Sequence, residues 1–429
     1  MSTVVRDSLR AAIARDSAAT LMARCAALAA CTDKPGEILR TFLSPAMELV
    51  HERMRPWLKS AGMEVSVDRA GSLRALYPSQ AGLDAPRLAI GSHLDTVPNA
   101  GAYDGVLGVL MGLALVEALG GRRLPFAIEV VGFSDEEGTR FGVPFIGSRA
   151  LVNRLSDALL LSKDEDGLTI GDALSRYAAA HREAVDPLLD PRTAGYLEFH
   201  IEQGPVLENR NLALGIVQAL AGQSRCHLVF HGRAGHAGTT PMQLRRDALA
   251  AAAEWVSFVE RTALSFSGLV ATVGQIAAEP GGVNVIPGVV RCSLDVRHAD
   301  DAVRSHAVKV VLDEARSIAS RRGLSVEAEE YHTQSAVHLD PTMISLADSA
   351  VHQAGYKTMR ITSGAGHDAM VMAEHMPAAM VFLRNPGGVS HHPDESVLEV
   401  DVAAAVHMGL HFLDEFAVFL EKKESDRLA

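Results

Sequence analysis

Histidine and carboxylate side chains recur at the ends of four apolar segments of this 429-residue sequence. Each segment is a short run of aliphatic and aromatic residues, typical of a buried strand, and leads into imidazoles or carboxylates. The residues at these positions are His93 with Asp95 and Asp104, Glu136 with Glu137, His200 with Gln203, and His391 with His392. Because open α/β sheets place their sites beyond the carboxyl ends of the strands, we expect these side chains to converge.

The chemistry of this set favours a pair of divalent metal ions. It offers nitrogen and oxygen ligands but no thiolate, which suits Zn²⁺ or Mn²⁺ rather than an iron–sulfur cluster or a Cys₄ site. Three imidazoles and two carboxylates, one of them bridging, are enough for two metals about 3.5–4 Å apart. The other glutamate of the pair Glu136–Glu137 can then move protons. Any one of these residues alone would more often be structural. The prediction therefore depends on the repeated occurrence of such residues after apolar strands.

The elements that must position these residues alternate between strands and helices, which indicates an α/β domain with a mixed, mostly parallel sheet flanked by helices. The first 65 residues are predicted to be helical, including 37–59, and further helices are predicted at 108–119 and 402–421. Apolar strands are predicted at 87–90, 127–133, 197–201 and 378–383.

A different pattern begins near residue 222. Its predicted order is βαββαβ, a split-βαβ arrangement of about a hundred residues. The predicted strands are 225–231, 269–276, 289–297 and 324–330, and the predicted helices are 243–262 and 300–320. We therefore expect a catalytic metal-binding domain made of residues 1–221 and 338–429, and an inserted α+β domain at 222–337.

Composition and charge narrow the possible partners. The chain has 40 Lys and Arg against 52 Asp and Glu, a net charge of -12, which argues against nucleic acid or an anionic membrane as a partner. The N-terminal segment lacks the apolar core of a signal peptide, and the longest apolar run, 106–116, is too short to span a bilayer. The 4 cysteines have no metal-site spacing and suit a reducing cytosol. We expect a soluble, cytoplasmic protein.

Seven motifs between residues 91 and 395 resemble those of the dinuclear M20 metallopeptidase-like amidohydrolases, and more narrowly the hydantoinase/carbamoylase branch. That branch contains N-carbamoyl-L-amino-acid hydrolases, β-ureidopropionases and allantoate amidohydrolases. The motifs are GSHLDTVPNAGAYDGVLG, SDEEGTRFG, EFHIEQGPVLE, GRAGHAGTTPM, GGVNVIPG, SGAGHDAM and GGVSHHPDE. One departure is that the family often has two glycines before the Tyr-Asp-Gly turn, where this chain has Gly101 between two alanines.

The resemblance implies that two divalent ions, Zn or Mn, share a bridging carboxylate. The implied ligands are His93 and His200 for one ion, Glu137 and His391 for the other, and Asp104 between them.

Further roles follow from the same resemblance. Asp95 would accept the other N–H of the His93 ring and fix its tautomer, and Glu136 would be the general base that acts on a metal-bridged hydroxide. His392 is the alternative ligand to His391.

The resemblance also implies a set of substrate contacts. An arginine would clamp a substrate carboxylate, an asparagine and a histidine would donate hydrogen bonds to an oxyanion or to that carboxylate, and a glutamine would contact a ureido group. The residue types alone leave a turn role open for the asparagine and a surface ion pair for the arginine. The residues concerned are Arg297, Asn284, His236, Gln203, and the loop with Gly366 and His367.

The function implied is hydrolysis of the carbamoyl C–N bond of N-carbamoyl-L-amino acids or allantoate. The alternatives are a dinuclear dipeptidase or N-acyl-amino-acid deacylase of the wider family, and a non-catalytic binding relative. The inserted domain would act as a lid and as the contact of a homodimer, and His236 could reach a site in its own or the partner protomer.

Overall fold

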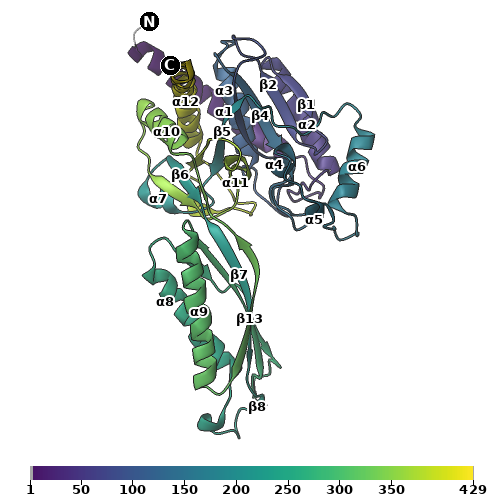
Figure 1. Cartoon of the computed structure of the whole chain (residues 1–429), viewed down its shortest axis with the longest axis vertical. Coiled ribbons are helices and arrows are strands. Elements are labelled where there is room, and N and C mark those ends of the chain that lie inside the picture. The colour runs from purple at the N-terminus through teal and green to yellow at the C-terminus, as the bar shows by residue number, and fades with distance from the viewer. Residues whose placement is uncertain (1–2, 429) are drawn as a thin grey trace. The chain divides into compact units, whose positions relative to one another are not determined.

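The structure is a computed structural model that describes residues 3–428, and it divides the chain into two compact units (Figure 1). The first unit combines Met1–Gln218 with Leu339–Ala429, and the second consists of Ala219–His338. Along the chain, the second unit is therefore inserted between the two halves of the first.

A mixed sheet forms the centre of the first unit, in the order β1-β2-β4-β3-β5-β16-β6, with β15 paired to β6. A ninth strand, β14, pairs with Ala219 and Leu220 at the end of β6, and these paired residues belong to the second unit. The four central strands, β4, β3, β5 and β16, are parallel, and the strands on both sides of them pair antiparallel. The strands are β1 (Glu64–Val67), β2 (Leu73–Tyr77), β3 (Arg87–His93), β4 (Ala127–Phe133), β5 (Thr193–Ile201), β6 (Leu214–Leu220), β14 (Val337–His338), β15 (Arg360–Ser363) and β16 (Ala378–Leu383).

Helices cover this sheet. Helix α3 packs on β3, β4 and β5, and its residues from Val106 to Val116 are all buried, which explains its continuous apolar sequence. Helix α11 packs on β5 and β16. The helices are α1 (Thr3–Ala29), α2 (Pro45–Ser60), α3 (Val106–Ala118), α4 (Ile146–Leu151), α5 (Asp157–Leu160), α6 (Ile170–Ala180), α7 (Val206–Arg210), α10 (Pro341–Gln353), α11 (Asp368–Ala373) and α12 (Glu399–Leu428), and the 3₁₀ turn η2 is Pro386–Gly388.

The parallel strands aim their carboxyl ends at one edge of the sheet. His93, at the end of β3, lies opposite Phe133, at the end of β4, and His200 of β5 lies opposite Phe382 of β16. The loops that follow these four strands therefore start close together, and they carry the histidines and carboxylates that the sequence singles out.

The second unit is an antiparallel five-stranded sheet, in the order β10-β12-β7-β13 with β9 on β12, packed against two helices. Its core surrounds the fully buried Trp255, and a separate two-stranded ribbon joins β8 to β11. The elements are β7 (Gly222–His231), β8 (Gly235–His236), η1 (Met242–Leu244), α8 (Ala248–Ser265), β9 (Val270–Thr272), β10 (Ile276–Glu279), β11 (Val285–Ile286), β12 (Val289–His298), α9 (Asp301–Arg321) and β13 (Ser325–Gln334).

Two expected elements differ from the structure. The helix expected at 37–59 begins only at Pro45, because Ser44 is extended and proline at the first helical position suits a helix start. The strand expected at 269–276 is broken into β9 and β10, and between them the Gln275 backbone N–H donates to the Ser293 hydroxyl. The expected mixed α/β sheet with flanking helices is confirmed.

Helix α12 is long and apolar enough, by length and composition alone, to cross a membrane over Glu399–Ser425, with a mean hydropathy of 1.3. However, 72% of the apolar stretch is buried within the protein, where the helix packs on α1, α3 and α10 (Figure 1). Its apolar sequence therefore matches that of a core helix.

Candidate metal centre

A tight turn before α3 holds Asp104 against the end of β3. Gly105, the next residue, has φ +67°, and a Cβ atom there would lie 2.5 Å from the ring of His93. Only glycine fits this close approach without strain. The Tyr-Asp-Gly turn therefore fixes the Asp104 carboxylate beside His93.

The two oxygens of Asp104 face two different groups of side chains. Oδ1 lies 3.4 Å from Nε2 of His93 and 3.1 Å from Nε2 of His200. Oδ2 lies 3.4 Å from Nε2 of His391, which is itself 3.3 Å from Oε1 of Glu137. Ligand atoms bound to one Zn²⁺ at 2.0–2.1 Å lie about 3.3 Å apart at tetrahedral angles. These separations fit two metal ions that share Asp104.

Hydrogen bonds to the backbone fix the tautomers of two of these histidines. Nδ1 of His93 lies 3.1 Å from the carbonyl oxygen of Asp95, and Nδ1 of His200 lies 2.8 Å from that of Ile201. Since a carbonyl only accepts, both Nδ1 atoms carry a proton, and in the neutral form of each ring the Nε2 lone pair faces Asp104.

The chemistry of this arrangement suits a cation. His200 Nε2 and Asp104 Oδ1 are both buried, and neither makes a hydrogen bond of acceptable geometry to any described residue. Burial alone would raise the pKa of Asp104, but attraction to protonated His200 and His93 outweighs it and holds that pKa well below its usual value. The carboxylate is thus ionised when positive charge lies beside it. Divalent metal ions can supply this charge in place of the ring protons, so the residues present suit the metals that the sequence predicts.

Asp95 positions the two glutamates. Its Oδ1 accepts the backbone N–H of Glu136 at 2.9 Å, and its Oδ2 accepts that of Glu137 at 3.1 Å. Its Oδ1 is also 3.4 Å from Nδ1 of His93, whose nearer acceptor is the Asp95 backbone carbonyl at 3.1 Å. Burial raises the pKa of Glu136 well above its usual value, and the neighbouring carboxylates of Glu137 and Asp368 add to this effect. Glu136 is thus a carboxyl group with a high proton affinity beside the proposed ligands.

The two histidines of the HH pair lie in different surroundings. His391 adopts a left-handed backbone, φ +55°, and turns its ring towards Asp104 and Glu137. His392 is exposed, and its Nδ1 accepts the backbone N–H of Asp394. Among the described residues, His391 belongs to a cluster of possible ligands and His392 to none.

Sequence reasoning missed Glu395, which fixes the turn that carries Asp104. Glu395 is buried, and its Oε1 accepts the backbone N–H groups of Tyr103 and Asp104 at 2.8 and 3.0 Å. A Cβ atom on Gly101 would lie 2.3 Å from the Glu395 side chain, so this one glycine makes room for it. The final glutamate of the motif GGVSHHPDE was the available signal.

Gln203 also contacts Asp104. Its amide Nε2 and the Ser390 hydroxyl each donate to Asp104 Oδ2 at 2.8 Å. The sequence suggested a contact with a ureido group, and Oε1 of the same amide has no hydrogen-bond partner among the described residues. One end of the amide therefore orients the carboxylate, while the other remains a possible acceptor.

The loop with Gly366 and His367 packs behind the centre. The His367 ring is 1% exposed, lies 4.4 Å from the His200 ring between centroids, and contacts the Ser363 hydroxyl through Nε2 at 3.0 Å. A Cβ atom on Gly366 would lie 2.7 Å from the Phe145 ring. In this structure the loop supports His200.

The remaining predicted substrate contacts belong to the second unit. The β8–β11 ribbon places His236 next to Asn284, whose carbonyl accepts the Ala237 N–H. Nδ1 of the exposed His236 accepts the N–H groups of Gly238 and Thr239, so its Nε2 presents an N–H to solvent. This polarity suits a donor to an oxyanion or a carboxylate.

Arg297 lies on β12 of the same unit. Its Nε and Nη2 donate to the two carboxylate oxygens of Asp295 at 2.8 and 3.0 Å. The guanidinium is thus held by a planar, two-point contact with a carboxylate, the geometry that a substrate carboxylate would use.

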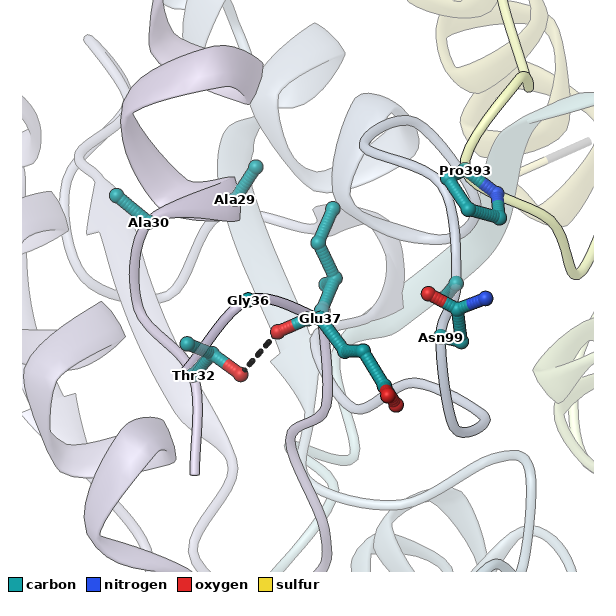
Figure 2. A pocket seen from close by; sticks show the side chains of 9 residues that line it. Ala29, Ala30, Thr32, Gly36, Glu37, Asn99 and Pro393 are labelled. Carbon is teal, nitrogen blue, oxygen red and sulfur yellow. Dashed lines mark hydrogen bonds between the residues drawn. The ribbon is translucent and has the colours of Figure 1, made fainter. Parts of the chain in front are cut away.

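A hollow of about 370 Å³ borders the loops that carry Asp104 and His391 (Figure 2). Glu37 is the only charged residue among those that line it, and no imidazole contributes. The Thr32 hydroxyl donates to the Glu37 carbonyl at 2.7 Å and closes one side of it. These lining residues lack the groups for metal or acid–base chemistry. They are Ala29, Ala30, Thr32, Gly36, Glu37, Ile38, Asn99, Ala100 and Pro393.

We expect Glu395→Ala to weaken metal binding about 10–100-fold, because the Asp104 turn loses the acceptor of two backbone N–H groups. Dialysis against a series of free Zn²⁺ concentrations, followed by measurement of bound metal, checks this expectation. Glu399→Ala, an exposed glutamate at the start of α12, is the control. Equal affinities in both variants would contradict a positioning role for Glu395.

The sequence is similar to that of several known proteins. The sequence model of peptidase family M20/M25/M40 matches residues 89–415. A probable allantoate deiminase from Oryza sativa subsp. japonica is 38% identical over 427 residues, which cover 90% of this chain and 86% of that protein. An N-carbamoyl-L-amino acid amidohydrolase from Geobacillus stearothermophilus is 35% identical over 385 residues, which cover 89% and 94%.

A solved structure agrees as well. The crystal structure of an amidase of the hydantoinase/carbamoylase family from Burkholderia multivorans superposes with a TM-score of 0.87 at 33% identity, covering 92% of this chain and 97% of that one. The chain therefore belongs to peptidase family M20/M25/M40, in its hydantoinase/carbamoylase branch, and is a hydrolase.

Proposed function

We propose that this enzyme hydrolyses the carbamoyl C–N bond of a small ureido carboxylate in the cytoplasm, either an N-carbamoyl-L-amino acid or allantoate. The observation that carries the proposal is that Asp104 faces two ligand groups at once, with the proton-accepting Glu136 beside them. The relatives named above support the substrate class, because one is an allantoate deiminase and the other an N-carbamoyl-amino-acid amidohydrolase.

The residues divide the chemistry among them. Zn²⁺ or Mn²⁺ ions bound at this centre would lower the pKa of a water molecule and polarise the scissile carbonyl. Glu136 takes a proton from the attacking water and returns it to the leaving nitrogen. The C–N bond breaks, and the products are carbamate, which decomposes to ammonia and carbon dioxide, and the free amine. His93, His200, Glu137 and His391 would hold the metal ions, and the two oxygens of Asp104 would be shared between them.

The second unit supplies the substrate contacts in this proposal. Nε2–H of His236 and the side chain of Asn284 donate to the oxyanion or to the carboxylate, and Arg297 clamps the carboxylate. Gln203 binds the ureido group, with the loop of Gly366 and His367 close by. The unit acts as a lid that closes over the centre, and it joins two protomers in a homodimer.

The substrate class is tested by ammonia release from allantoate and from several N-carbamoyl-L-amino acids, with Mn²⁺ and Zn²⁺ supplied separately. We expect metal-dependent release from at least one ureido carboxylate. Faster turnover of dipeptides or N-acetyl-amino acids would favour the peptidase or deacylase alternative. A metal-loaded protein inert on all these amides would favour a binding relative.

Variants of the two adjacent glutamates distinguish a role in proton transfer from a role in metal binding. Glu136→Gln should lower turnover by about 10²–10⁴-fold with metal content unchanged, because the amide cannot accept the proton. Glu137→Gln should lose bound metal instead, because it removes a ligand beside His391. Activity assays paired with elemental analysis make the distinction. Loss of metal in Glu136→Gln would assign that residue to the ligands and remove it as the base.

Arg297→Lys should raise KM about tenfold with a smaller change in kcat, because lysine cannot form a two-point contact with a carboxylate. Steady-state kinetics on the best ureido substrate measure KM and kcat separately. Arg291→Lys is the control, since Arg291 is an exposed residue of the same strand. A KM that stays at the wild-type value would leave Arg297 as a structural partner of Asp295 alone.

A further inference from the structure

Two terminal helices bring together another set of metal-ligating side chains. His407 and His411 are four residues apart on α12, so both project from one face of the helix. Asp7 of α1 meets them, with its Oδ1 3.0 Å from Nε2 of each ring. The two histidines are 3% and 8% exposed, whereas the Asp7 side chain is 45% exposed, so water reaches the cluster from one side.

The spacing of these atoms matches that of the metal centre described above. The two imidazole–carboxylate distances of 3.0 Å compare with 3.1–3.4 Å around Asp104. All three possible ligand atoms lie within 4.8 Å of one another. A single metal at bond lengths of about 2.0–2.1 Å fits among them.

One tautomer of His411 directs a lone pair at Asp7. The Gln353 amide nitrogen donates to Glu415, so its carbonyl Oε1 is the atom presented to Nδ1 of His411, at 3.3 Å. When the ring proton lies on Nδ1 and is donated to this carbonyl, Nε2 carries a lone pair. In that tautomer Nε2 and the Asp7 carboxylate are two acceptors 3.0 Å apart, and a metal ion between them satisfies both.

Arg10 competes for the same ring nitrogen. Its Nη1 also lies 3.3 Å from Nδ1 of His411 and can only donate, which favours the other tautomer, but its Nη2 is bound to Asp414. Nδ1 of His407 has no hydrogen-bond partner among the described residues, so no contact on that side prevents its Nε2 from acting as a ligand.

We propose that Asp7, His407 and His411 form an additional site for a divalent transition metal of the zinc class, separate from the centre at Asp104. Imidazole ligands select Zn²⁺, Cu²⁺ or Ni²⁺ over Mg²⁺ and Ca²⁺. Water completes the coordination, because the protein supplies three ligands. Bound metal ties α1 to α12 and so links the two ends of the chain.

The test counts bound zinc. Wild type, His411→Gln and Asp7→Asn are equilibrated with excess Zn²⁺, passed through a desalting column and measured by elemental analysis against protein concentration. We expect both variants to hold one zinc ion per chain fewer than wild type, with unchanged amidohydrolase turnover. His352→Gln, an exposed histidine of α10, controls for loosely bound surface zinc and should match wild type.

Equal zinc content in wild type and both variants would overturn the proposal and leave the cluster as a hydrogen-bonded contact between helices. Circular dichroism verifies that each variant is folded. If His411→Gln does not fold, Asp7→Asn alone tests the proposal, because it keeps the shape of the side chain. Because the comparison is a difference between proteins that share the Asp104 centre, it does not depend on the metal content or substrate of that centre.

Discussion

A buried, ionised carboxylate surrounded by imidazole lone pairs is the constraint on which the rest of this structure depends. The backbone carbonyls of Asp95 and Ile201 hold one proton of each ring on the side away from Asp104, so neutral rings give the carboxylate no hydrogen-bond donor on that side among the described residues. Removing a charge from water without a partner costs several kcal/mol. The arrangement is therefore stable as a site for cations.

A few loops set the distances between the side chains of the centre. Four parallel strands deliver their ends to one edge, but the strands alone would not set distances to within a few tenths of an ångström. The Asp104 turn does so through Gly105, which lets it approach His93, and through Glu395, which accepts two of its N–H groups. Asp95 fixes the two glutamates in the same way, because its carboxylate accepts their backbone N–H groups. Preorganisation of this kind is what metal-assisted hydrolysis needs.

The sequence predicts the scaffold where burial is complete. The strands at 127–133 and 378–383 have the predicted bounds, because a strand buried on both faces reads as an unbroken apolar run. The prediction fails at 37–44. Apolar spacing there suggests a helix, but the backbone forms hydrogen bonds to other loops instead. The prediction also misses Glu395, whose role depends on a contact 291 residues away, and the meeting of Asp7 with α12. Such pairings depend on tertiary structure alone.

Crystals of the protein grown with Mn²⁺ or Zn²⁺ and measured by anomalous X-ray scattering test the central claim most directly. We predict two peaks about 3.5–4 Å apart, one on each side of the Asp104 carboxylate, with His93, His200, Glu137 and His391 as their ligands. Fully loaded crystals without anomalous density beside Asp104, or with those histidines turned away from it, would contradict the claim.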